Sequence, residues 1–303
     1  MTKPTPLEPA PESLAPGRDV FLKREDVHEL GAFKWRGALP TLEAYRAGGA
    51  ATVVTASTGN HGAATAWAAG QLGLRAIVYV PEAVSREKLG IIERLGAEVR
   101  ATGTDLDQAK LAATEYTAEN DLPFFEDGAE QPQYKGYGAI GAEILEQLEA
   151  PPAAVVVPVG NGALLGGIGI EICRTNPQTL RIGVVAKGAP VMAESWEAGG
   201  PVESGSSATF ADGMAVRVAI PFAVSVLGEV ASRMLLVSER AIAQAVGAFD
   251  RVGIRVEGSP AAALASLGQI EELDGPVVLV VTGRNIDEDL HQRAVNDPDS
   301  FPD

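Results

Sequence analysis

The chain has 303 residues, of which 46% are hydrophobic and 21% charged, so it is long enough to bury the core of one large or two ordinary domains. Its formal net charge of −16 argues against nucleic acid or an anionic membrane as a partner. The single cysteine, Cys173, excludes an intrachain disulfide, and we expect a reducing, cytoplasmic location.

The first segment is rich in proline and lacks the basic start and apolar run of a secretory signal, so we expect no signal peptide. The longest apolar stretch, residues 153–170, contains Pro158, Asn161 and several glycines. This composition predicts a buried strand, a tight loop and a helix, not a membrane span.

Lys34 is the first reactive candidate in chain order, and it lies between Phe33 and Trp35. The two aromatic side chains withdraw the amine from water, and Arg36 adds a like charge. Both effects disfavour the ammonium form and leave an amine able to attack a carbonyl, as Schiff-base chemistry requires. The same segment also fits a lysine at a helix start whose ammonium reaches solvent.

Short β-branched runs alternate with helix-like segments along the chain. The runs are Thr52–Thr55, Ala76–Val80, Val155–Val159, Ile182–Val185 and Val277–Val281, and the helical segments include Asn60–Leu72, Ser85–Leu95, Leu106–Asn120 and Tyr134–Leu148. This alternation predicts an α/β fold of parallel βαβ units with helices on both faces of the sheets. The Gly- and Ser-rich residues 199–207 are expected to form a surface loop.

Parallel sheets bind ligands beyond the carboxyl ends of their strands, and the first unusual loop at such an end spans residues 55–62. Ser57 and Thr58 can cap the helix that begins at Asn60, while Gly59 allows the backbone to approach a ligand closely. The amides of a helix start favour an anion such as a carboxylate. An ordinary capped turn is the alternative.

The second loop, residues 158–167, has glycines at 160 and 162 that leave backbone amides uncovered at a helix start, which suits a phosphate. It lacks the Lys-Ser/Thr pair of a P-loop and the later acidic residue of a dinucleotide site, so a monophosphate fits better. A third loop follows the strand Val277–Val281, where the Thr282 hydroxyl either binds a flat ligand or caps the turn.

An amine, a carboxylate loop, a phosphate loop and a hydroxyl donor together fit pyridoxal phosphate and an amino acid. In these motifs, and in its residues 22–26 and 33–38, the chain resembles the fold-type II family of pyridoxal phosphate-dependent enzymes, the tryptophan synthase β superfamily. Its serine/threonine dehydratase and serine racemase branch is the most similar. The similarity runs from about Phe21 to Asp287.

This resemblance implies roles for particular residues. Lys34 would form the Schiff base and act as general base, and Thr58 is the second catalytic candidate. The cofactor would be bound by Phe33, Lys34, Asn60, Gly160, Asn161, Gly162, Ala163, Leu164 and Thr282. The substrate would be bound by Ser57, Thr58, Gly59 and His61.

The resemblance also implies a fold of two three-layer α/β/α domains with mostly parallel sheets and the cofactor in the cleft between them. We predict a small domain at 43–138, a large one from 1–42 plus 139–303, and a homodimer. The implied enzyme is a pyridoxal phosphate-dependent ammonia-lyase that removes water and then ammonia from a β-hydroxy amino acid. A threonine synthase-like replacement enzyme and an amino acid racemase using Thr58 are alternatives, as is a catalytically silent cofactor- or amino-acid-binding protein.

Several residues depart from the pattern of this branch: Asn161 and Ala163 stand where it typically has glycines, and Thr282 where it usually has serine, and Arg284 and Lys187 are further departures. Arg284 follows Thr282-Gly283, where the branch usually has glycine or alanine. One possibility is that Arg284 forms an ion pair at the surface or within the structure. The other is that it contacts an acidic substrate side chain, such as that of 3-hydroxyaspartate, and Arg284 is therefore a candidate substrate-binding residue. Lys187 lies after the strand Ile182–Val185, where metal-dependent members carry a glutamate, so we expect no divalent metal there.

Overall fold

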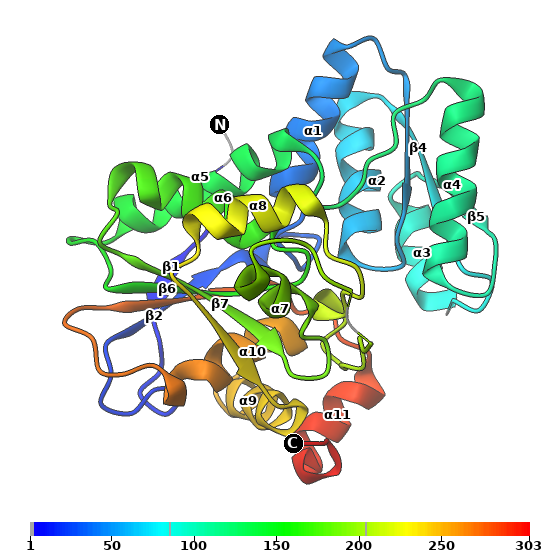
Figure 1. The fold of residues 1–303 in the computed structure, drawn as a ribbon. Helices are drawn as coiled ribbons and strands as arrows, with labels where there is room; N and C mark the ends of the chain where they lie inside the picture. Colours follow the sequence, from blue (N-terminus) through cyan, green and yellow to red (C-terminus); the bar gives the residue numbers. More distant parts are fainter. Residues whose placement is uncertain (1–2, 85, 204) are drawn as a thin grey trace. The chain divides into compact units, whose positions relative to one another are not determined.

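The computed structural model describes residues 3–84, 86–203 and 205–303, and packing divides the chain into two compact units. The larger unit contains the residues up to Phe33 together with Tyr137–Asp303, and the smaller unit is Lys34–Gly136. Each unit has helices packed on its own sheet (Figure 1). The predicted α/β class with mostly parallel sheets is therefore confirmed.

The larger unit contains a six-stranded sheet in the order β1-β2-β9-β6-β7-β8. Its strands are β1 (Leu7–Pro9), β2 (Val20–Arg24), β6 (Ala154–Pro158), β7 (Leu180–Ala186), β8 (Arg233–Val237) and β9 (Val277–Val281). Only the edge strand β1 pairs antiparallel, and the remaining pairs are parallel. All five residues of β6 and of β9 are buried, which explains their continuous apolar sequences.

Helices cover both faces of this sheet. Figure 1 shows α5, α6 and α8 on one face and α9, α10 and α11 on the other. The helices are α5 (Gln131–Gln147, whose residues 131–136 count with the smaller unit), α6 (Ala163–Thr175), α7 (Val191–Ala198), α8 (Pro221–Val230), α9 (Glu239–Arg251), α10 (Gly258–Ala265) and α11 (Glu288–Asn296). Four 3-10 turns are η1 (Glu25–Val27), η2 (Asp212–Met214), η3 (Ser266–Gln269) and η4 (Pro298–Ser300).

The smaller unit has a parallel three-stranded sheet in the order β3-β4-β5, made of β3 (Thr52–Ala56), β4 (Arg75–Val80) and β5 (Glu98–Ala101). Its helices are α1 (Trp35–Ala47), α2 (Asn60–Leu72), α3 (Arg86–Arg94) and α4 (Leu106–Asn120). In Figure 1, α2 and α4 lie on opposite sides of β4. Local signals set the helix limits: the Asp105 carboxylate accepts from Gln108 N at the start of α4, and Gly73 ends α2 with a φ of 68°.

The helices predicted at Asn60–Leu72 and Leu106–Asn120 have the observed limits, and α3 and α5 each agree with their predictions apart from the terminal residues. Ser85, the expected first residue of one helix, and Ser204, in the expected loop, lie outside the described residues. Residues 34–42 pack with the smaller unit, because α1 contacts α2, whereas the predicted limits placed them in the large domain. The domain limits 43–138 stay a prediction.

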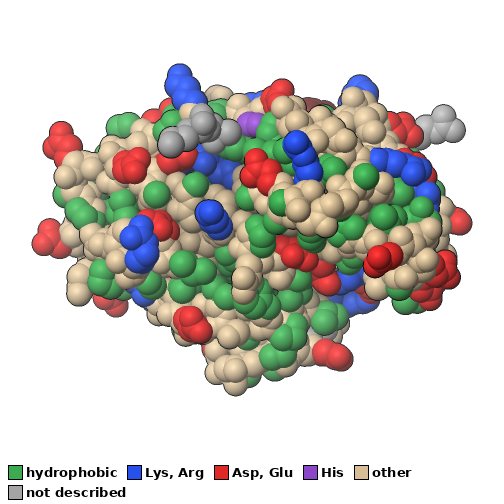
Figure 2. Space-filling view, turned by 90° about the horizontal axis from the view of Figure 1, so that it is seen from above, with side chains coloured by type: hydrophobic (Ala, Val, Ile, Leu, Met, Phe, Trp, Pro, Cys, Tyr) green, Lys and Arg blue, Asp and Glu red, His purple; other side chains and the backbone are tan. Residues whose placement is uncertain are grey.

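In the part of the chain that the structure describes, no helix is long and apolar enough to cross a membrane. On the face drawn in Figure 2, Lys and Arg side chains are interspersed with Asp and Glu side chains. Acidic and basic side chains thus alternate over this face.

Candidate active site

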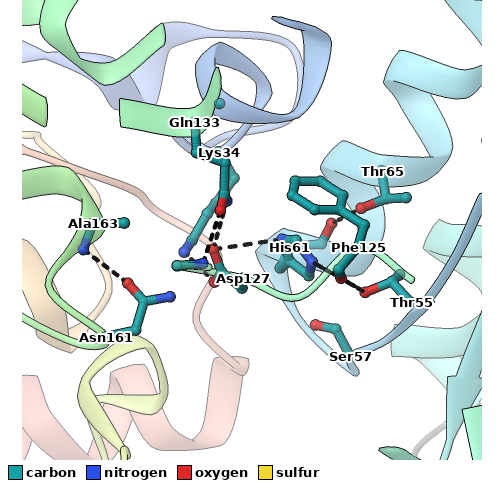
Figure 3. Close-up of polar contacts among 12 residues, drawn as sticks. Lys34, Thr55, Ser57, His61, Thr65, Phe125, Asp127, Gln133, Asn161 and Ala163 are labelled. Atoms are coloured by element: carbon teal, nitrogen blue, oxygen red, sulfur yellow. Dashed lines mark hydrogen bonds and ion pairs between the residues drawn. The ribbon is translucent and has the colours of Figure 1, made fainter. Parts of the chain in front are cut away.

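Lys34 lies immediately before α1 in the smaller unit, and its side chain is 15% exposed. Its Nζ atom forms an ion pair with Oδ2 of Asp127, which lies 93 positions along the chain (Figure 3). Trp35 instead packs edge-on against Trp67, with ring centroids 6.2 Å apart, and the Arg36 guanidinium lies over the Trp35 ring. These surroundings differ from the expected ones, because a carboxylate lies beside the amine.

Asp127 is held in place by the first turn of α5. Gln133 Nε2 donates to its Oδ1 atom at 3.0 Å, and Gln133 Oε1 accepts from the amide of Gly128 at 2.8 Å. The Tyr134 hydroxyl donates to the carbonyl of Gly128, also at 2.8 Å. Burial alone would raise the pKa of the Asp127 carboxyl, but the Lys34 ammonium, His61 and Gln133 hold that pKa well below its usual range.

His61 lies in the first turn of α2, with its ring buried 4.5 Å from the ring of Phe125. Its Nε2 atom is 3.0 Å from Oγ1 of Thr55, which itself donates to the carbonyl of Phe125. The Thr55 oxygen is therefore the acceptor, and we assign the proton to Nε2. Nδ1 then faces Oδ1 of Asp127 at 3.7 Å. Burial lowers the pKa of His61, although Asp127 acts in the opposite direction.

The candidate substrate loop connects β3 to α2. Ser57 Oγ accepts from the amide of Gly59 at 3.2 Å, and Gly59 is the N-cap residue of α2 without a side-chain cap. Thr58 is half-buried, and Asn60 is the first residue of the helix. Ser57 thus bonds within the loop itself, and the N-cap residue Gly59 provides no side-chain cap for α2. A helix start of this kind suits an anion.

The candidate phosphate loop lies in the larger unit, between β6 and α6. Gly162 has a φ of 92°, a conformation that side chains with a Cβ atom rarely adopt. A Cβ atom on Gly160 would lie 2.1 Å from the carbonyl oxygen of Gly213, so only glycine fits there. Asn161 Oδ1 accepts from the amide of Ala163 at 3.1 Å, and the buried Leu164 follows in α6.

Thr282 lies directly after β9 in the same unit and is 1% exposed. Its Oγ1 atom is buried and has no hydrogen-bond partner among the described residues. Its carbonyl accepts from the amide of Phe33 at 3.0 Å, so two predicted cofactor-binding residues from opposite ends of the chain are neighbours. The Phe33 ring lies 5.2 Å from that of Tyr137.

Arg284 and Lys187 are both exposed. The amide of Arg284 donates to the carbonyl of Gly31 at 2.9 Å, which ties its loop to the segment before Lys34. Among the described residues, no group of three or more His, Cys, Asp and Glu side chains is arranged as metal ligands would be.

Comparison with known proteins identifies the family. The family model described as "Pyridoxal-phosphate dependent enzyme" matches residues 1–283. The chain belongs to this family. It is 34% identical over 275 residues to an L-threonine ammonia-lyase of Geobacter sulfurreducens, covering 89% of this chain and 68% of that protein.

Solved structures of the same family have the same fold. The processed form of threonine deaminase isoform 2 from Solanum lycopersicum aligns with a TM-score of 0.89 at 29% identity, covering 96% of this chain and 87% of that one. A serine racemase from Dictyostelium discoideum aligns with a TM-score of 0.85 at 26% identity, covering 94% of each chain. The predicted family, its serine/threonine dehydratase branch and its cofactor are confirmed.

The residues of this pyridoxal phosphate-dependent enzyme fit the cofactor group by group. The partly buried amine of Lys34 would suit the aldehyde, and the glycines among residues 160–164 would leave room for a phosphate. The buried, unpartnered hydroxyl of Thr282 suits a ring nitrogen, which would satisfy a polar atom otherwise without a partner among the described residues.

Sequence reasoning missed Asp127, although its carboxylate pairs with Lys34. The only local signal is its place in a Glu126-Asp127-Gly128 turn ahead of a helix. Such turns are common at surfaces, so this pattern indicates a loop and no more.

Proposed function

We propose that this chain converts a β-hydroxy amino acid, threonine or serine, into a 2-oxo acid and ammonia. The carrying observation is the partly buried amine of Lys34, held before α1 by a carboxylate, in a chain that aligns over 89% of its length with an L-threonine ammonia-lyase. A reactive lysine of this kind suits covalent chemistry at a carbonyl.

When bound, pyridoxal phosphate supplies the electron sink for loss of a proton from the substrate. In our proposal the Lys34 amine holds the cofactor, is released when the substrate amine takes its place, and then removes the proton from Cα. Residues 160–164 would hold the phosphate, and the neutral hydroxyl of Thr282 would face the ring nitrogen. A neutral partner favours the uncharged ring more than a carboxylate would, which suits loss of a β-hydroxyl group.

Substrate binding is proposed for the loop that contains Ser57, Thr58 and Gly59. The start of α2 attracts a carboxylate through its amides, and Gly59 has open space where a Cβ atom would stand. The sequence also suggested His61 for this role. Its nitrogens instead face Thr55, Phe125 and Asp127, so we propose that His61 packs within the smaller unit and does not bind the substrate. Arg284 is exposed, which favours its surface role.

The decisive test measures cofactor absorbance and 2-oxo acid release after addition of L-threonine, L-serine or 3-hydroxyaspartate. We expect product from a β-hydroxy amino acid and a loss of at least about a hundredfold in Lys34→Ala, because the general base is removed. The exposed lysine variant Lys110→Ala is the control. If the Cα proton exchanges and a D-amino acid forms without any 2-oxo acid, the chain is a racemase instead. If the cofactor binds and no amino acid is turned over, the chain is a catalytically silent binding protein.

We further propose a homodimer located in the cytoplasm, in line with the resemblance and the single cysteine. Light scattering of the eluting protein during gel filtration measures the mass. A mass of one chain at micromolar concentration would refute the dimer.

A further inference from the structure

Glu239 is the first residue of α9, yet its carboxylate binds a distant segment. Glu239 is 5% exposed, and its Oε2 atom accepts from the hydroxyl of Thr209 at 2.9 Å and from the amide of Phe210 at 3.1 Å. The N-terminal cap of α9 comes from Ser238, whose Oγ atom accepts from the amide of Ala241 at 3.2 Å. The start of α9 is thus capped without Glu239, which instead binds residues 30 and 29 positions earlier in the chain.

The segment that Glu239 binds leads directly into η2. The Thr209 hydroxyl oxygen also accepts from the amide of Ala211 at 3.1 Å. The Ala211 carbonyl in turn accepts from the amide of Met214, the last residue of η2, at 2.7 Å. A series of hydrogen bonds therefore connects the carboxylate at the start of α9 to this 3-10 turn, and all of these residues belong to the larger unit.

The turn η2 lies against the candidate phosphate loop. A Cβ atom on Gly160 would lie 2.1 Å from the carbonyl oxygen of Gly213 and 3.8 Å from Cα of Met214, so the two backbones are in direct contact. Backbone atoms cannot rotate out of the way as side-chain atoms can, so a shift of η2 changes the path of the loop. The backbone amides of a loop bind a phosphate only while they point toward one place.

Packing alone does not explain a carboxylate at this position. Oε1 of Glu239 is buried and has no hydrogen-bond partner among the residues that the structure describes. A buried polar atom without a partner lowers stability, so an apolar side chain would serve packing better. The carboxylate therefore fits a role that depends on its other oxygen, which binds Thr209 and Phe210.

We infer that Glu239 is a positioning residue for the cofactor phosphate: through the segment 209–214 it holds residues 160–164 in the shape that binds the phosphate. The inference rests on the proposed function, in which this loop binds the phosphate. Glu239 acts through the backbone and needs no contact with the cofactor itself. Its loss should therefore weaken binding of the phosphate and leave binding of the ring unchanged.

The test compares pyridoxal phosphate with pyridoxal, which lacks the phosphate, by calorimetric titration of the cofactor-free protein. The wild type should bind pyridoxal phosphate more tightly than pyridoxal. In Glu239→Ala we expect the affinity for pyridoxal phosphate to fall about tenfold, the effect of about one net hydrogen bond, and the affinity for pyridoxal to change less than about twofold. A general loss of structure would weaken both ligands alike, so the ratio of the two affinities reports on the phosphate site.

Three further variants separate this role from a purely structural one. Glu239→Gln keeps an oxygen that can accept both hydrogen bonds and should retain the wild-type ratio. Thr209→Val removes one donor and the bond to Ala211, and it should lower the ratio by less than Glu239→Ala does. Gln244→Ala, at an exposed position of the same helix, is the control and should leave both affinities unchanged. Circular dichroism confirms folding of each variant.

Hydrogen exchange measured by mass spectrometry decides the inference without any ligand. The amides of residues 160–164 should exchange faster in cofactor-free Glu239→Ala than in the wild type, and at the wild-type rate in Gln244→Ala. Unchanged exchange in folded Glu239→Ala overturns the inference, as does an equal loss of affinity for both ligands. If Glu239→Ala does not fold, Thr209→Val is judged by the same two outcomes.

The wild type by itself tests the proposed function. If it binds pyridoxal as tightly as pyridoxal phosphate, the proposed phosphate role of residues 160–164 is refuted, while hydrogen exchange still decides whether Glu239 holds the loop.

Discussion

Single glycines in the candidate phosphate loop are required by contacts within the larger unit. Gly160 meets the backbone of Gly213, which cannot rotate away as a side chain would. Gly162 needs its left-handed conformation for α6 to begin at Ala163. The loop can adopt its shape because Gly160 and Gly162 have no Cβ atom, and the backbone that a Cβ atom on Gly160 would meet belongs to η2.

We therefore predict that Gly160→Ala displaces the loop and weakens cofactor binding. The clash should also cost about 1–3 kcal/mol of unfolding free energy, as overpacking usually does. Gly228→Ala in α8 is the matched control, because a Cβ atom there meets nothing within 4 Å and alanine favours a helix. Urea denaturation and cofactor titration measure both effects. Equal cofactor affinity in Gly160→Ala and wild type would contradict the predicted displacement.

His61 provides a second prediction at the residue scale, concerning stability and pH. Its pKa in the folded protein lies below the ordinary value of 6.5 because the ring is buried. Between these two values the unfolded chain binds more protons than the folded one, so stability falls as the pH falls below about 6.5. The slope for one proton is at most about 1.4 kcal/mol per pH unit.

Urea denaturation from pH 5 to 7 should show this slope in the wild type and a flatter dependence in His61→Gln. His28→Gln, at a half-buried site outside this cluster, is the control and should keep the slope. A wild-type slope that persists in His61→Gln would assign the effect to other groups.

At the scale of elements, a buried polar cluster joins the first segment, β2 and α5. Lys23 is fully buried, and its Nζ atom donates to Glu143 at 2.6 Å, to Gln147 at 2.8 Å and to the carbonyl of Thr5 at 2.9 Å. The ammonium is thus well satisfied by groups from two other elements. These bonds connect β2 of the six-stranded sheet to α5.

Removal of one partner should be costly because it leaves a buried charge. We predict that Glu143→Leu loses about 3–5 kcal/mol of unfolding free energy, whereas the double variant with Lys23→Met recovers most of this loss. Glu171→Ala, in an exposed pair with Arg174, is the control and should cost at most about 1 kcal/mol. Chemical denaturation of the wild type, both single variants Glu143→Leu and Lys23→Met, the double variant and the control measures these losses and the coupling, and a double variant no better than Glu143→Leu alone would refute the prediction.

Some elements follow from the sequence more closely than others. The helix Asn60–Leu72 has a glycine at each end and the strand Val277–Val281 is uniformly apolar, so both were predicted with the observed limits. The strand β8 was not predicted, although four of its five residues are apolar. β8 pairs in parallel with β7, whose residues lie about 50 positions earlier in the chain. A local sequence pattern does not indicate such a distant pairing.

At the scale of the whole molecule, the chain forms two units with separate sheets. The smaller unit has its own core, in which Val54, Ile77 and Tyr79 pack against Ala109 and Ala113 of α4. A unit of this size can bury enough apolar surface to fold alone. We therefore expect the smaller unit to fold by itself.

We predict that a fragment of residues 34–147, which keeps α5 whole, unfolds cooperatively in urea with native-like circular dichroism. A fragment of residues 43–147, which begins near the predicted domain limit and lacks most of α1, should be less stable because α1 packs on α2. Equal stability of the two fragments would favour the limit predicted from the sequence.

The sequence by itself determined the fold class and the family, and it predicted Lys34, the glycine loop and Thr282 as site residues, because these depend on residue type and short-range pattern. Only the tertiary structure decided that Asp127 pairs with Lys34, that His61 faces this carboxylate, and that Phe33 bonds to Thr282. These contacts join residues dozens to hundreds of positions apart, and packing selects them from many equivalent carboxylates and amides in the chain.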